Sequence, residues 1–110
     1  MKKMLLITSI AGLAMLGAAH AAGDAEAGKA KSAMCLACHG ADGNSAAPNF
    51  PKLAGQHADY IAAQLRAYRL GYEDESGRTN DGEAMIMRTT AFGLSDREID
   101  AVASYASGLK

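Results

Sequence analysis

Residues 35–39 read Cys35-Leu36-Ala37-Cys38-His39 and contain both cysteines of the chain. Two cysteines that are separated by two residues and followed directly by a histidine have the spacing of covalent haem attachment. The two thiols add across the two vinyl groups of haem, and the adjacent His39 ligates the iron as the proximal ligand. The motif therefore predicts one covalently bound haem c, with its iron, as the cofactor of the chain.

Three other uses of the cysteines compete with this interpretation: a disulfide, a thioredoxin-like redox pair and a zinc site. A disulfide needs only the two thiols, and a thioredoxin-like redox pair belongs in a βαβ setting, for which the sequence has no strand pattern. Zinc would be held by the two cysteines together with His39 and His57. A histidine directly after a cysteine departs from the usual ligand spacing of tetrahedral zinc sites. All three alternatives are therefore less favoured than haem.

Residues 1–21 have the pattern of a secretory signal peptide. Two lysines give a positive start, an apolar run of sixteen residues covers 4–19, and Ala19-His20-Ala21 forms a small-x-small cleavage site. An uncleaved membrane anchor is the less favoured alternative, because a span needs about 20 apolar residues. We expect cleavage after this site, export to the periplasm, and a single haem domain over 22–110 with no stable membrane insertion.

Charge and core size narrow the function further. Lys2 and Lys3 lie in the expected leader, so the remaining 89 residues hold nine basic side chains against twelve acidic ones, a net charge of −3. The sequence has no basic patch interleaved with aromatic residues, which argues against nucleic acid as a partner. The same 89 residues contain only nineteen large apolar side chains. So small a core needs completion, and a large apolar cofactor provides it.

The sequence predicts an all-α domain. A first helix is expected from a cap at Asp24 to about Met34, and a second, amphipathic helix over 59–70. The last helix has a Ser95/Glu98 capping box, with Leu94 and Ile99 at the two positions of a hydrophobic staple. Two long loops, 40–56 and 71–93, remain between the helices. Loops of this length are uncommon unless they have a function.

Several segments of the chain resemble class I c-type cytochromes, most closely the second haem domain of bacterial two-haem respiratory cytochromes c. The matching segments are Cys-Leu-Ala-Cys-His-Gly (35–40), Ala-Asp-Gly-Asn-Ser (41–45), Pro-Asn-Phe-Pro-Lys-Leu-Ala-Gly-Gln-His (48–57), Arg-Thr-Asn-Asp-Gly (78–82), Met-Ile-Met-Arg (85–88) and Leu-Ser (94–95).

The resemblance implies a class I cytochrome c fold, with three to four helices and loops wrapped around one covalently attached haem. The first and last helices then cross near Gly28 and Tyr105. This chain has one Cys-x-x-Cys-His motif where the two-haem proteins have two. We therefore expect one of three arrangements: a free single-haem carrier, a homodimer, or a pair with another haem domain.

A second axial ligand is expected, because haem proteins that only pass electrons close both axial positions. After cleavage the candidate methionines are Met34, which is tied to the attachment helix, Met85 and Met87. Spacing does not separate the last two. The resemblance implies Met87, seven residues before the leucine of the Leu-Ser pair, and leaves Met85 to fill the core beside the ring. His57 is the rival for a bis-histidine site.

The resemblance also implies a partner for the histidine. A proline carbonyl thirteen residues after the first cysteine holds the free ring nitrogen of the histidine, which here is Pro48, with Pro51 as the runner-up. Candidates to meet the haem propionates are Lys52, Gln56, Tyr60 and Arg78.

The expected function is electron transfer by a periplasmic single-haem cytochrome c that is not an enzyme. A membrane-bound reductase would be the electron donor, and an oxidase or another cytochrome the acceptor, through small and transient interfaces. The alternative is a haem-based sensor of small ligands, or a peroxidase-like protein, in which the methionine ligand is labile.

Overall fold

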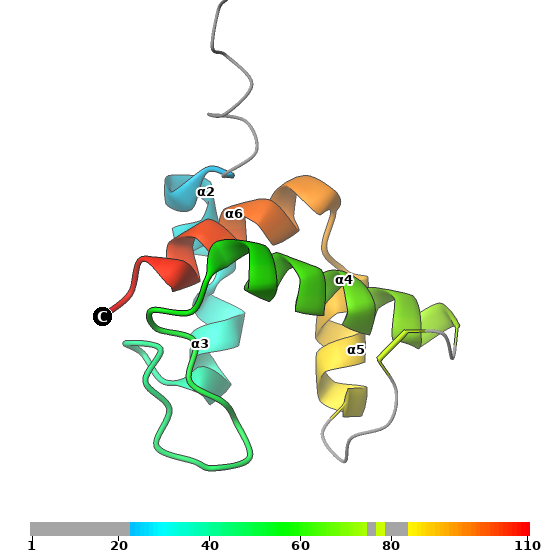
Figure 1. Ribbon diagram of the computed structural model, residues 1–110, viewed down its shortest axis with the longest axis horizontal. Coiled ribbons are helices and arrows are strands. Elements are labelled where there is room, and N and C mark those ends of the chain that lie inside the picture. Colours follow the sequence, from blue (N-terminus) through cyan, green and yellow to red (C-terminus); the bar gives the residue numbers. More distant parts are fainter. Residues whose placement is uncertain (1–22, 75–76, 79–83) are drawn as a thin grey trace, which may run out of the picture.

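The computed structural model describes residues 23–74, 77–78 and 84–110, and these residues form five helices and no strand (Figure 1). The all-α prediction is confirmed, although the described residues contain five helices where the sequence predicted three to four. The expected leader, 1–21, lies outside the described residues. No helix among the described residues has both the length and the apolar character needed to cross a membrane.

The first predicted helix is two helices in the structure. Helix α2 (Ala25–Lys31) begins after Asp24, whose carboxylate accepts hydrogen bonds from the backbone N–H groups of the first turn, at 3.0 and 3.3 Å. A turn at the buried Ser32 separates it from α3 (Ala33–His39). The haem-attachment motif therefore occupies the end of α3, and its histidine is the last helical residue.

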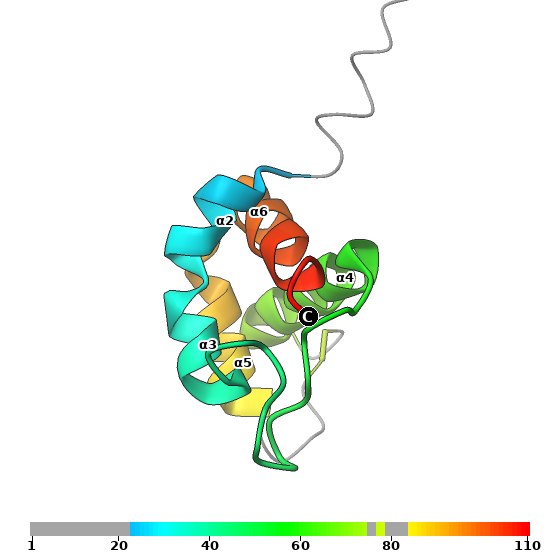
Figure 2. The same ribbon diagram turned by 90° about the vertical axis from the view of Figure 1, so that its left-hand side faces the viewer.

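Helix α2 packs across α6 (Asp96–Ser107) (Figure 2), with Gly28 at the contact. A Cβ atom at Gly28 would lie 2.0 Å from the backbone oxygen of Ala101 and 3.0 Å from the backbone nitrogen of Val102. The predicted crossing at Gly28 is confirmed, but its nearest neighbours on α6 are one turn before Tyr105. Only a glycine permits this approach of the two helices.

The predicted start of α6 is confirmed in detail. The Ser95 hydroxyl accepts from the Glu98 N–H at 3.1 Å, and the Glu98 carboxylate accepts from the Ser95 N–H at 3.0 Å. Leu94 and Ile99 are both buried, as a hydrophobic staple requires. Helix α4 (Ala58–Glu73) begins one residue before its predicted start and continues past Gly71.

Helix α5 (Ala84–Phe92) lies inside the segment predicted to be a loop, so that prediction was wrong. The helix packs against α4 and buries only small side chains, Ala84 and Ala91, both with 0% exposure. Its larger side chains are exposed or half-buried, so the sequence carries little of the apolar periodicity that marks a helix.

The core is shared by α4, α5 and α6. Its larger members are Ile61, Leu65, Tyr68, Leu94, Ile99 and Val102, and the partly buried Cys35, Leu53 and Met87 pack against it. At its surface the guanidinium of Arg66 lies 2.8 Å from Asp100, and that of Arg69 lies 2.5 Å from Asp96. These ion pairs join α4 to α6. The two helices are therefore held together by both apolar and polar contacts.

Candidate functional site

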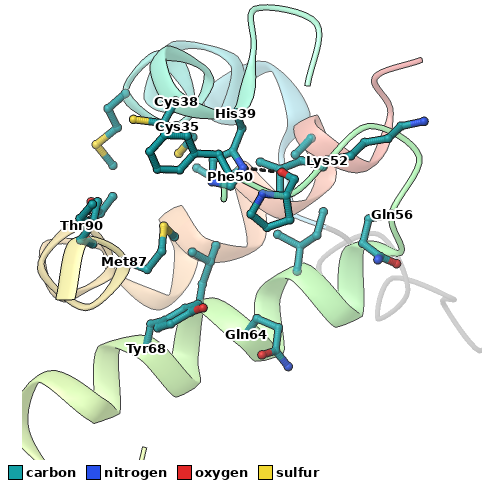
Figure 3. A pocket seen from close by; sticks show the side chains of 18 of the residues that line it. Cys35, Cys38, His39, Phe50, Lys52, Gln56, Gln64, Tyr68, Met87 and Thr90 are labelled. Atoms are coloured by element: carbon teal, nitrogen blue, oxygen red, sulfur yellow. Dashed lines mark hydrogen bonds between the residues drawn. The ribbon is translucent and has the colours of Figure 1, made fainter. Parts of the chain in front are cut away.

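A cavity of about 480 Å³ lies between α3, the 49–56 loop, α4 and α5 (Figure 3). Its size is within the range of small-molecule and cofactor pockets, about 300–1,000 Å³. Core residues of α4 and α6, among them Ile61, Leu65 and Val102, form part of its lining. The molecule therefore has, beside its small core, a concave apolar site large enough for an organic cofactor.

Both cysteines and the histidine of the motif face this cavity. Cys35 is half-buried and Cys38 is exposed, and both are free thiols. Burial, and then the neighbouring Cys38, raise the pKa of the Cys35 thiol. His39 is buried, with 6% of its surface exposed, and Phe50 meets its ring edge-on at a centroid distance of 6.3 Å. The whole attachment motif thus lies on one wall of the site.

His39 is oriented by Pro51, and the prediction of Pro48 was wrong. The Nδ1 atom of His39 lies 2.6 Å from the carbonyl oxygen of Pro51 (Figure 3). A carbonyl only accepts, so Nδ1 carries the proton and donates, and Nε2 keeps the lone pair with which an imidazole binds a metal.

The local turn explains why Pro51, and not Pro48, presents its carbonyl to His39. The N–H of Phe50 donates to the carbonyl of Ala47 at 3.1 Å, so 47–50 is a β-turn with Pro48 at its second position, where the fixed φ of proline is favoured. Pro48 is exposed there and is absent from the lining of the cavity. It stiffens the turn, and the next proline presents the carbonyl.

Backbone hydrogen bonds hold the rest of the 40–56 loop to the end of α3 and to itself. The Ser45 N–H donates to the carbonyl of His39 at 2.9 Å, and the N–H groups of Leu53 and Ala54 donate to the carbonyl of Gly43 at 2.8 and 3.0 Å. Gly40, directly after His39, has φ +91°, which lets the chain turn away from the helix. The loop is long because its hydrogen bonds hold the Pro51 carbonyl, the acceptor for Nδ1 of His39, in place.

Met87 faces the cavity from α5, across from the motif (Figure 3). Met85 is 58% exposed and is not part of the lining, so the expectation that it fills the core beside the ring was wrong. Met34 lines the cavity from α3, the helix of the two cysteines. Of the three methionines, Met87 alone combines a place in the cavity with a position across from His39.

His57 is exposed, directly precedes α4 and is absent from the cavity lining. Among the described residues no group of three or more His, Cys, Asp or Glu side chains is placed to hold a metal ion. Neither the bis-histidine site nor the zinc site considered from the sequence therefore finds support in this arrangement.

The four residues proposed for contact with the haem carboxylates, Lys52, Gln56, Tyr60 and Arg78, all line the cavity. Sequence reasoning missed Gln64, Tyr68 and Thr90, which line it as well. The first two lie on the cavity-facing stripe of α4, in the segment 59–70 that was predicted only as an amphipathic helix. A glutamine on an otherwise apolar stripe was the one available signal of a polar patch inside the site.

Residues 25–110 match the family model for cytochrome c. The chain belongs to the cytochrome c family. Cytochrome c4 of Stutzerimonas stutzeri is 44% identical over 105 residues, which cover 96% of this chain and 50% of the relative. Cytochrome c-554(548) of Halomonas halodenitrificans is 44% identical over 86 residues, 78% of this chain and 96% of that protein. This cytochrome therefore spans about half the length of the cytochrome c4 that it matches.

The crystal structure of reduced recombinant cytochrome c4 from Pseudomonas stutzeri has the same fold, with a TM-score of 0.71 and 46% identity over 81% of this chain and 47% of that one. The predicted membership in the class I c-type cytochromes, and the relation to the two-domain cytochromes c4, are confirmed. The family implies covalent haem c with iron.

The residues of this cytochrome fit that group. Two free thiols, an imidazole with a fixed tautomer and a thioether all reach one largely apolar cavity. Thioether bonds, a proximal histidine and an axial methionine use this set of donors. The site therefore supplies a donor for each bond that haem c makes.

Proposed function

We propose that this cytochrome is a single-haem electron carrier of the periplasm. Cys35 and Cys38 bind the haem covalently, and His39 and Met87 are the axial ligands of its iron. One observation carries the proposal: His39 and Met87 face the same cavity from α3 and α5, with both cysteines on its wall. Residues 1–21 are the signal peptide and 22–110 the haem domain.

Each side chain has a defined role in this function. Bound haem c supplies an iron that gains and loses one electron. The carbonyl of Pro51 holds the proton on Nδ1 of His39 and fixes the ring, so that Nε2 is the ligating atom. The Met87 thioether would supply the second protein ligand of the iron, and methionine ligation raises the reduction potential. With both ligands in place, no position on the iron would remain for a substrate, so we propose a carrier and not an enzyme.

The surface around the cavity suits electron transfer to a partner protein without any covalent bond to that partner. Several residues that line the cavity are exposed to solvent, among them Cys38, Tyr60 and Ile86. Electrons would therefore pass through the edge of the bound haem that lies beside these exposed residues. The partner proteins would dock there briefly, over small interfaces. We propose a membrane-bound reductase as the donor and an oxidase or another cytochrome as the acceptor. Because the chain has one motif, it forms a homodimer or pairs with a second haem domain where a two-haem unit is needed.

The absorption spectrum of the purified holoprotein tests the ligand assignment. A low-spin ferric spectrum with the weak sulfur-to-iron band at the red end is expected for the native protein. Met87→Ala should lose this band and become high-spin, because its sixth ligand is removed. Met85→Ala is the matched control and should keep the band, since Met85 is exposed outside the cavity.

Two results would contradict the proposal. A native protein that is high-spin and takes up carbon monoxide readily is a ligand sensor or a peroxidase-like protein. Loss of the sulfur band in Met85→Ala, with retention in Met87→Ala, reverses the ligand assignment. Haem that stays with the chain through denaturing electrophoresis supports the covalent bonds, and haem that is lost there contradicts them.

A further inference from the structure

The hydrogen bond to Pro51 does not by itself fix the plane of the His39 ring. The bond sets the direction of Nδ1 at 2.6 Å, but the imidazole can still rock about a single acceptor. The torsion that turns a histidine ring about its Cβ–Cγ bond has broad minima. His39 is also the last residue of α3, and helix ends fray. A second contact is therefore needed to hold the ring in one orientation.

Phe50 makes this second contact. Its ring and the imidazole of His39 have centroids 6.3 Å apart and planes inclined at 64° (Figure 3). Aromatic rings in an edge-to-face arrangement have centroids about 4.5–7 Å apart. Both residues line the cavity, where Phe50 is half-buried and His39 is buried. The Phe50 ring is therefore placed to limit the rotation of the imidazole inside the site.

The chain holds Phe50 from both sides. The N–H of Phe50 donates to the carbonyl of Ala47 at 3.1 Å, and the Ser45 hydroxyl donates to the same carbonyl at 3.0 Å. Phe50 also directly precedes Pro51, and the residue before a proline is restricted to an extended backbone. One short, stiff segment therefore presents an aromatic ring and a carbonyl oxygen to the same imidazole.

The groups around a ligating histidine set the orientation of its ring as well as its basicity. We infer that Phe50 is a positioning residue, whose ring fixes the plane of the His39 imidazole while the Pro51 carbonyl fixes the proton on Nδ1. Phe50 thus acts on the iron only through His39, and it determines the orientation in which Nε2 faces the cavity. This inference rests on the proposed function, in which His39 is an axial ligand.

The test compares Phe50→Leu with Phe92→Leu in the holoprotein. Phe92 is exposed, lies outside the cavity lining and stacks on Tyr72 with centroids 4.2 Å apart, so the control also removes one aromatic pair. The proton NMR shifts of the haem methyl groups in the ferric protein depend on the angle of the imidazole plane. Phe50→Leu should change the order or the spread of these shifts, and Phe92→Leu should keep the native pattern.

A second readout follows the Nδ1 proton of His39 in the ferrous protein. This proton exchanges with deuterated solvent only when its bond to the Pro51 carbonyl opens, so the exchange rate reports how firmly the ring is held. Loss of one edge-to-face contact should raise this rate about fivefold in Phe50→Leu, whereas Phe92→Leu should leave it unchanged. Phe50→Tyr keeps the aromatic ring and should restore both the native methyl pattern and the native exchange rate.

The inference is overturned if Phe50→Leu keeps the native methyl shifts and exchange rate, or if Phe92→Leu changes them equally. It is also overturned if Phe50→Tyr departs from the native protein as far as Phe50→Leu does. Should Phe50→Leu fail to accumulate as holoprotein, the same two measurements on Phe50→Met decide. The sulfur-to-iron band is recorded for every variant: its retention beside unchanged methyl shifts contradicts this inference alone, whereas its absence from the native protein contradicts the proposed function.

Discussion

Replacement of Gly28 by alanine should strongly destabilise this cytochrome, because α2 and α6 meet there backbone to backbone. The new Cβ atom would lie 2.0 Å from the oxygen and 2.5 Å from the carbon of the Ala101 carbonyl, whereas ordinary contacts begin at 3.4 Å. The two helices must therefore separate by roughly 1 Å, a form of overpacking that typically costs about 1–3 kcal/mol. Since both obstacles are backbone atoms, we expect the upper value, about 3 kcal/mol.

Thermal unfolding of the holoprotein, followed by far-UV circular dichroism, measures this effect. For a domain of this size each kcal/mol lowers the Tm by about 4–8 °C, so the expected loss is about 12–24 °C. Gly93→Ala is the matched control, because its nearest neighbour would be the Thr90 oxygen at 3.9 Å and its φ is not in the left-handed region. Equal Tm values for the two variants would refute the tight crossing of α2 and α6.

Two further predictions concern the cofactor and the pH. Without haem, the Cys35→Ala/Cys38→Ala protein should be largely unfolded, because a cavity of about 480 Å³ then replaces part of its core; a cooperative, native-like helical melt of this apoprotein would contradict us. The pKa of Glu98 is lowered to about 2, first by its hydrogen bond to Lys31 and then by the backbone and side chain of Ser95. A lowered pKa means that its stabilising effect is present above the ordinary value of 4.5 and is lost as the pH falls towards 2. Acid titrations of stability should therefore show a smaller decrease over this range for Glu98→Gln than for the native protein, and identical titrations would disprove the role of this carboxylate.

The sequence predicted the features that depend on local patterns. The Cys-x-x-Cys-His motif and the Ser95/Glu98 capping box are recognised from neighbouring residues alone, whereas the crossing at Gly28 was implied by the resemblance to class I cytochromes c. The two motifs located the attachment site and the start of α6. The all-α class followed from the absence of strand patterns.

What the sequence missed depends on contacts between distant segments. Helix α5 buries two alanines, and the hydroxyls of Thr89 and Thr90 donate to carbonyls one turn back, at 2.9 and 2.8 Å, so neither composition nor periodicity marks it as a helix. The choice between Pro48 and Pro51 was set by the 47–50 turn and by the hydrogen bonds to Gly43. Only the folded loop shows which carbonyl meets His39.

Iron-edge X-ray absorption of the ferric holoprotein identifies the atoms bound to the iron and so decides whether His39 and Met87 are its ligands. The proposed ligation by His39 and Met87 predicts four porphyrin nitrogens, one imidazole nitrogen and one sulfur, and predicts that the sulfur disappears in Met87→Ala but not in Met85→Ala. A first coordination sphere without sulfur in the native protein, with nitrogen, oxygen or an open position in its place, would contradict the account.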